Sequence, residues 1–161
     1  MSQPPPVVSD AEAARLAAAY LDAHYRWASS GDWHDIRIGL PVPGLELLHP
    51  AVARFGLLSA WNPYSRPRDE ASNRRKDAEL EAELDARGFE HIPSFSSAPN
   101  RSWREPGWVI FDIDKADLDG LSRRFGQLGA LWWERDGPVR LRMQARRPAG
   151  FRRDAAIDWL E

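Results

Sequence analysis

The sequence contains no cysteine, which excludes disulfide bonds, thiolate metal sites and cysteine nucleophiles. It also lacks any run approaching the ~18 apolar residues that a membrane span needs. The N-terminus does not have the basic-then-apolar pattern of a signal peptide. We therefore expect a cytoplasmic protein that does not associate with membranes, and the lack of cysteine agrees with a reducing compartment.

Motifs for several kinds of chemistry are missing as well. No G-x-S-x-G nucleophile elbow occurs, and the glycines at 126 and 129 follow an expected helix, where a phosphate-binding loop would precede one. The four histidines share neither an expected element nor an i,i+4 spacing: His24, His34, His49 and His91. We therefore predict neither a metal site nor a bound cofactor.

Lysine is scarce, since only Lys76 and Lys115 are lysines among 22 basic residues. High-GC codon usage produces such a composition, and so does recognition of anions, because the arginine guanidinium presents a planar fork of donors. The net charge of −2 gives no general attraction to nucleic acid or to a membrane surface.

The chain is long and apolar enough for one folded domain, with 161 residues, a hydrophobic fraction of 43% and eight tryptophans. Residues 1–8, with their run of three prolines, indicate a disordered arm. Residues 9–143 are expected to form a single α+β domain. Residues 144–161 form an arginine-rich C-terminal tail.

Hydrophobic periodicity predicts six elements in β-α-β-β-α-β order, at residues 57–62, 70–87, 89–95, 107–113, 114–125 and 130–134. This order is typical of a ferredoxin-like, split βαβ sandwich. An added helix to about residue 27 and a strand at 34–40 precede the unit, and an extra strand at 139–143 follows it. We expect an open sheet with helices on one face, the other face being covered by the N-terminal helix, a second subunit or a ligand.

This topology brings polar residues from distant parts of the sequence to one pole of the domain. The first strand ends there, the 70–87 helix begins there, and the 96–106 loop and the 126–127 turn lie at the same end. The residues expected at this pole are Asn62, Asn73, Arg74, Arg104, Glu105 and Gln127. We expect Asn62 to be extended because it precedes a proline, and Glu105 to be flanked by arginines.

Helical phase singles out Asn73. It precedes Leu80 and Leu84 by seven and eleven residues, so at ~100° per residue it lies on their buried stripe. A buried amide needs hydrogen-bond partners. Asn73 is therefore expected either to brace the 59–66 turn or to hold a ligand.

The same residues carry a family resemblance. The segments concerned are Ala60-Trp61-Asn62-Pro63, Asn73-Arg74-Arg75, Trp103-Arg104-Glu105-Pro106 and Arg124-Phe125-Gly126-Gln127. Together with Leu80, Leu84 and Gly88, this pattern resembles the bacterial family called domain of unknown function 3293, over a signature region at about 55–143. The resemblance implies a small, soluble bacterial protein without an assigned activity.

The leading functional hypothesis is an uncharacterised bacterial protein that binds a small polar or anionic ligand, nucleotide-like or phosphate-like, at the pole. Asn62, Asn73 and Gln127 would contact its polar edges. Arg74 and Arg104 would hold its charge, and Glu105 would orient them. The dipole of the 70–87 helix favours a negative group at this end. The sequence leaves open whether a reaction occurs; if one does, Glu105 is the candidate catalytic residue for hydrolysis or transfer.

Two alternatives belong to other functional classes. RNA or single-stranded DNA would bind on the sheet face, stacking on Trp61 and Trp108, as in modules with the same element order. A protein-interaction or assembly module without catalysis, for example a homodimer, would bury the same face and the tail.

Overall fold

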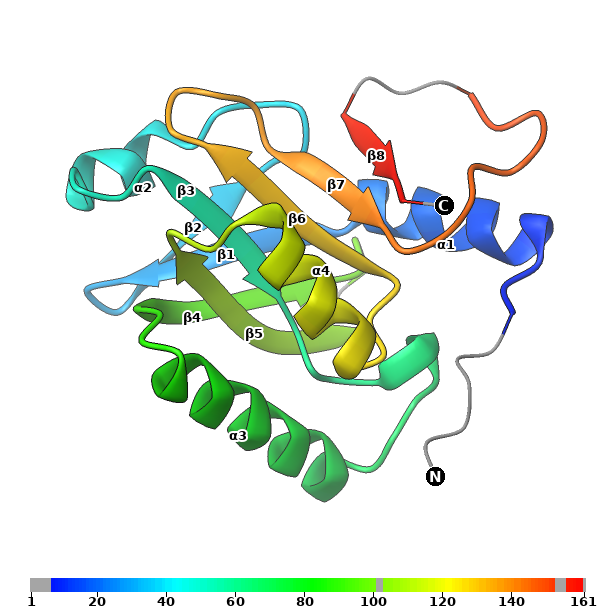
Figure 1. Ribbon diagram of the computed structural model, residues 1–161, viewed down its shortest axis with the longest axis horizontal. Helices are drawn as coiled ribbons and strands as arrows, with labels where there is room; N and C mark the ends of the chain where they lie inside the picture. Colours follow the sequence, from blue (N-terminus) through cyan, green and yellow to red (C-terminus); the bar gives the residue numbers. More distant parts are fainter. Residues whose placement is uncertain (1–6, 101–102, 153–155, 161) are drawn as a thin grey trace.

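In the described part of the chain, eight strands form one sheet in the order β2-β1-β4-β5-β3-β6-β7-β8, and the sheet curls into a half-barrel (Figure 1). This computed structural model describes residues 7–100, 103–152 and 156–160. The strands are β1 His24–Ser29, β2 Asp32–Ile36, β3 Arg54–Leu58, β4 His91–Ser97, β5 Arg104–Phe111, β6 Gly129–Glu134, β7 Arg140–Met143 and β8 Ile157–Trp159. Neighbouring strands are antiparallel except β7 and β8, which are parallel.

Four helices cover the sheet within the described residues: α1 Asp10–Asp22, α2 Pro43–Leu48, α3 Glu70–Ala86 and α4 Lys115–Arg124. A 3₁₀ turn, η1 Pro63–Ser65, lies between β3 and α3. Serine or aspartate side chains cap α1, α3 and α4, as expected for helix N-termini. None of the helices in the described part of the chain has the length and apolar character needed to cross a bilayer.

The predicted mixed α+β class is confirmed, whereas the ferredoxin-like arrangement is not. The four strands of the predicted unit lie side by side in the order β4-β5-β3-β6. They are the middle of a longer sheet, which β1 and β2 extend on one side and β7 and β8 on the other. The result is a curled half-barrel in place of an open four-stranded sandwich.

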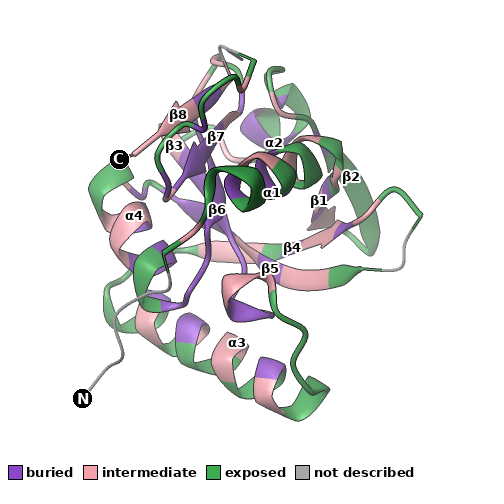
Figure 2. Cartoon of the chain, turned by 90° about the vertical axis from the view of Figure 1, so that its right-hand side faces the viewer, coloured by how far each residue is buried: buried purple, intermediate pink, exposed green. Residues whose placement is uncertain are grey.

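The sheet has a hydrophobic cluster on each face. On one face α3 and α4 contribute Leu80, Leu84, Leu118 and Leu121, which pack with Leu58 and Ile110 of the sheet. On the other, Leu16 and Ala17 of α1 and Leu45 of α2 pack against Phe55 and Trp133. Figure 2 shows α1 lying in the hollow of the curled sheet. The face left open by the sequence prediction is therefore covered by the chain's own N-terminal elements.

The N-terminal helix is shorter than predicted. It ends at Asp22, and Tyr25 and Trp27 belong to β1, where they are buried at two-residue spacing. The apolar spacing of Tyr20, His24 and Trp27 fits a helix locally, but β1 pairs with both β2 and β4. Those long-range hydrogen bonds outweigh the local helical preference.

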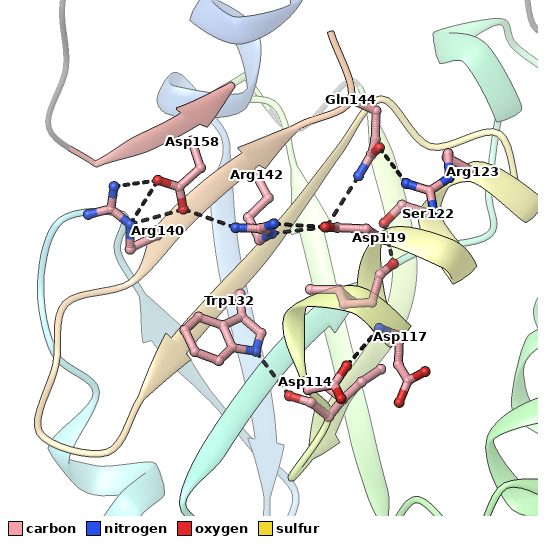
Figure 3. Close-up of polar contacts among 12 residues, drawn as sticks. Asp114, Asp117, Asp119, Ser122, Arg123, Trp132, Arg140, Arg142, Gln144 and Asp158 are labelled. Atoms are coloured by element: carbon pink, nitrogen blue, oxygen red, sulfur yellow. Dashed lines mark hydrogen bonds and ion pairs between the residues drawn. The ribbon is translucent and has the colours of Figure 1, made fainter. Parts of the chain in front are cut away.

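The ends of the chain also differ in part from the prediction. The expected disordered arm at 1–8 falls mostly outside the described residues. Residues Ile157–Trp159 of the predicted tail form β8 on the edge of the sheet. Figure 3 shows a chain of alternating charges that connects β8 to α4 through β7: Arg140, Asp158, Arg142 and Asp119.

Candidate functional site

Two asparagines bind each other where β3 leads into α3. The backbone N–H of Asn62 donates to Asn73 Oδ1 at 2.9 Å, and Asn73 Nδ2 donates to Asn62 Oδ1 at 3.0 Å. Asn73 Nδ2 also donates to the carbonyl of Arg68 at 3.3 Å. Asn73 is 1% exposed, as its helical phase predicts, and its amide braces the 62–68 turn. The two asparagines thus fix the start of α3 relative to the end of β3.

The expected extended conformation of Asn62 is wrong. Its φ and ψ are 47° and 60°, in the left-handed region, and Tyr64 and Ser65 also have positive φ. Asparagine tolerates this region better than most residues. Two hydrogen bonds hold this conformation. The backbone N–H of Asn62 donates to the side-chain Oδ1 of Asn73, and the backbone N–H of Arg68 donates to Asn62 Oδ1 at 3.0 Å. Such strained backbone is often found at functional sites.

Glu105 lies next to this turn, near the start of β5. Its Oε1 accepts hydrogen bonds from Asn62 Nδ2 at 3.1 Å and from Trp103 Nε1 at 2.7 Å. Among the described residues, both donors contact Oε1 and none contacts Oε2. Burial raises the pKa of Glu105 above its ordinary value, and the hydrogen bonds from Asn62 and Trp103 oppose that rise without cancelling it. Among the described residues, the donors to Glu105 are these two neutral groups and not the expected arginines.

Gln127 closes the same region from the end of α4. Its Nε2 donates to the carbonyls of Trp61 at 2.9 Å and Phe125 at 3.3 Å. The backbone N–H of Tyr64 donates to the carbonyl of Gly126 at 2.6 Å, which joins η1 to the same turn. Asn62, Asn73, Glu105 and Gln127 are therefore brought together as the topology predicts.

A pocket of about 280 Å³ opens beside Glu105. One wall comes from α1, β1 and the link between them, and the other from the 62–65 turn, the 96–98 segment, β5 and Gln127. The lining residues are Arg15, Leu16, Ala19, Tyr20, Ala23, Tyr25, Asn62, Ser65, Ser96, Ser97, Ala98, Trp103, Glu105 and Gln127. Within the described lining, the pocket thus combines apolar and aromatic surface with one carboxylate, one guanidinium and several hydroxyl and amide groups.

Two tyrosines that the sequence analysis did not select form part of this wall. The Tyr20 hydroxyl oxygen accepts from the Gly129 N–H at 3.1 Å, and the Tyr25 O–H donates to the Tyr20 carbonyl at 2.6 Å. A Cβ on Gly129 would lie 2.8 Å from the Tyr20 ring, so glycine is required for this contact. Burial, followed by the nearby charge of Glu105, raises the pKa of Tyr20. Burial also raises the pKa of Tyr25, with smaller contributions from Tyr20 and Glu105.

The two arginines expected at the pole do not line the pocket. Arg74 lies on the exposed face of α3, where its Nε donates to Glu70 at 3.0 Å. Arg104 is exposed at the start of β5 and, because successive strand residues point to opposite faces, is directed away from the side that Glu105 occupies. Asn73 lies behind the pocket, in contact with Asn62. Within the described ranges, no cluster of three or more acidic or histidine side chains offers a ligand set for a metal ion.

The fold and site define a mixed α+β protein with a small pocket beside a half-barrel sheet. Residues 58–129 match the family described as "Protein of unknown function (DUF3293)", which confirms the resemblance of this segment to that family. The match includes Asn62, Asn73, Glu105 and Gln127, whereas Tyr20 and Tyr25 lie outside it. No curated protein and no solved structure matches the chain.

Proposed function

We propose that the pocket binds a small polar ligand and that Glu105 is its principal hydrogen-bond acceptor. The observation that carries this proposal is the state of the Glu105 carboxylate. It faces a pocket, two neutral donors fix its orientation, and one of its oxygens has no donor among the described residues. A carboxylate oxygen that faces a pocket in this way is available to accept a hydrogen bond from a ligand.

The dimensions of the pocket support a small ligand. Its volume of about 280 Å³ lies just below the range of ~300–1,000 Å³ that is typical of small-molecule sites. Leu16, Ala19 and Ala23 offer apolar contact to the body of a ligand. Glu105 and the hydroxyl groups of Ser65 and Ser96 offer polar contacts to it.

A polar ligand has more support here than an anionic one. The hypothesis of a nucleotide-like or phosphate-like ligand required Arg74 and Arg104 to bind its charge. Neither arginine lines the pocket. Arg15 is the basic residue among the described lining, but 69% of its side chain is exposed and it contacts Glu12 at 3.7 Å. An anion in the pocket would also face the charge of Glu105.

Catalysis is a second candidate, and it uses the same residue. A general base works best when its pKa is brought toward the operating pH, and burial shifts the pKa of Glu105 in that direction. If the ligand is a substrate, Glu105 is placed to accept a proton from a bound hydroxyl, amine or water. Hydrolysis or group transfer is the class of reaction that such a base would assist.

The two other functional classes gain little support from the sheet. Nucleic-acid binding required an open face with Trp108 available for stacking. Trp108 instead packs with the α3–α4 cluster and donates to Asp77 of α3 at 3.1 Å. The chain's own helices pack on both faces of the central strands, so the sheet offers no argument for an assembly module among the described residues.

A ligand screen by thermal unfolding tests the proposal. Ligands that raise the melting temperature of the wild type would be tested again on Glu105→Gln, which keeps the shape and the acceptor for Asn62 and Trp103. Glu79→Gln is the matched control, because it makes the same change on the exposed face of α3, where Glu79 contacts Lys76 at 2.9 Å. We expect stabilisation to be lost in Glu105→Gln only. Ligands that stabilise both variants equally would show that the site lies elsewhere.

A further inference from the structure

We infer that the ligand of this pocket carries a protonated amine that forms an ion pair with Glu105, together with a short apolar body. This inference rests on the proposed function, because it requires that the pocket bind a ligand. It adds the charge of the ligand and the group that Glu105 contacts.

The first observation is the absence of a cationic partner for Glu105 among the described residues. Its two donors are an amide N–H and an indole N–H, both neutral. By contrast, Asp119 and Asp158 each contact an arginine, at 2.7 and 2.6 Å. Half-buried charges in proteins are usually paired. Within the described lining, Glu105 is the carboxylate of the pocket, so a ligand cation is well placed to pair with it.

The geometry of the carboxylate gives the second observation. Oε1 already accepts two hydrogen bonds, from Asn62 and Trp103, which hold the carboxylate plane in place. Oε2 has no donor in the described part of the chain. A primary ammonium group has three N–H donors, so it can bind Oε2 and still donate to a neighbouring hydroxyl such as that of Ser96, the cross-strand partner of Glu105. Hydrogen bonds in which one partner is ionised are about twice as strong as neutral ones, and an ammonium donor adds the attraction between opposite charges.

The aromatic residues of the lining give the third observation. Tyr20, Tyr25 and Trp103 surround the same pocket as Glu105. Electron-rich aromatic rings attract cations within about 6 Å of their centres, and sites for organic ammonium groups commonly combine such rings. The same rings and carboxylate disfavour an anion. The apolar side chains of Leu16 and Ala19 then accommodate a hydrocarbon body.

Three probes of matched shape test the inference: benzylammonium, benzyl alcohol and benzoate, each added at equal ionic strength. At ~10 times its Kd, benzylammonium should raise the melting temperature of the wild type by about 3 °C. Benzyl alcohol should raise it less, and benzoate should not raise it. Glu105→Gln should abolish the benzylammonium effect, whereas Glu79→Gln should keep it.

A second readout uses the wild type alone, so it does not depend on the folding of a variant. Benzylammonium should shift the Trp103 Nε1–H resonance in NMR spectra saturably, because this N–H donates to the carboxylate that the ammonium binds. The inference is overturned if benzoate or benzyl alcohol stabilises as well as benzylammonium, if Glu105→Gln retains the benzylammonium effect, or if the Trp103 resonance does not move.

These outcomes separate the inference from the proposal on which it rests. If the ligand screen yields a neutral or anionic compound whose binding requires Glu105, the amine is wrong and the pocket remains the site. If neither the probes nor any compound of the screen depends on Glu105, the proposed function fails with it.

Discussion

Two regions of this protein contain partly buried carboxylates whose pKa values are shifted in opposite directions. In the pocket, Glu105 accepts hydrogen bonds from two neutral donors, and burial raises its pKa. At the edge of the sheet, burial would also raise the pKa of Asp158, but hydrogen bonds and charge from Arg140, together with the charge of Arg142, lower it. The same kind of group therefore has a raised pKa without a cationic partner among the described residues in one region, and a lowered pKa beside two arginines in the other.

The difference indicates what each region does. The charges of Arg140, Asp158, Arg142 and Asp119 alternate, and each finds its counterpart within the chain (Figure 3). Such a network needs no external partner, and it connects β8 and α4 to β7. Glu105 lacks a counterpart among the described residues and borders a pocket. A carboxylate with a raised pKa beside a cavity suggests a binding site, whereas a network of paired charges suggests a structural one.

The largest expected effect comes from breaking the charge network. Arg142→Leu removes one ion pair from Asp119 and one from Asp158. The arginine contacts them at 2.7 and 3.2 Å, and its side chain is only 9% exposed. We expect the free energy of unfolding to fall by about 3 kcal/mol, measured by urea denaturation. A fall below about 0.5 kcal/mol, typical of an exposed ion pair, would show that the network is not structural.

The next largest effect concerns the frame of the pocket. Asn73→Ala removes the acceptor of the Asn62 N–H and the donor to Asn62 Oδ1 in a buried position. We expect a loss of about 2 kcal/mol in the free energy of unfolding, together with weaker ligand binding because Asn62 orients Glu105. Unchanged stability in urea would show that the asparagine pair does not brace the turn.

A smaller effect is expected in how the free energy of unfolding depends on pH when Glu105 or Asp158 is replaced. Because the folded-state pKa of Glu105 lies above its ordinary value of 4.5, the wild type loses stability as pH rises through the window above 4.5. Glu105→Gln lacks this loss, so its stability relative to the wild type should increase over that window. Asp158→Asn should have the opposite signature, since the contribution of Asp158 is present above its ordinary value of 3.8 and is lost as pH falls below it. Parallel pH profiles for the two variants would contradict the comparison.

The smallest effect is expected at Arg74. Its side chain is 71% exposed and contacts Glu70 one helical turn earlier. Arg74→Ala should change the free energy of unfolding by no more than about 0.5 kcal/mol and should leave ligand binding unchanged. If a titration shows that this variant no longer binds the ligand, Arg74 contributes to the binding site and the prediction is wrong.

The sequence predicted the parts of the site that depend on local periodicity and on strand order. Helical phase placed Asn73 on the buried stripe of α3, and the β-α-β-β-α-β order brought Asn62, Glu105 and Gln127 to one pole. The expected position of Arg74 at the site was not supported by helical phase. Arg74 follows Asn73 directly, so its side chain is rotated by ~100° from the buried stripe, toward solvent. Strand alternation likewise separates Arg104 from Glu105.

The parts that escaped prediction depend on long-range contacts. The pocket wall from Tyr20 and Tyr25 exists because α1 packs in the hollow of the sheet and β1 pairs with β4. The apolar stripe at 16–27 fits one long helix equally well. The signal present in the sequence was Gly129, whose missing side chain leaves room for Tyr20, but a glycine after a helix has a simpler local interpretation.

We propose above all that the Glu105 carboxylate forms an ion pair with a cationic group of a ligand. The most direct test is a pH titration of the side-chain carboxyl ¹³C resonances of Glu105 and Asp158, repeated for Glu105 with saturating benzylammonium. We predict a pKa above 4.5 for Glu105 in the free protein, a pKa below 3.8 for Asp158, and a fall in the pKa of Glu105 when the ammonium binds. A pKa of Glu105 at or below 4.5, or one that benzylammonium leaves unchanged, would contradict the account.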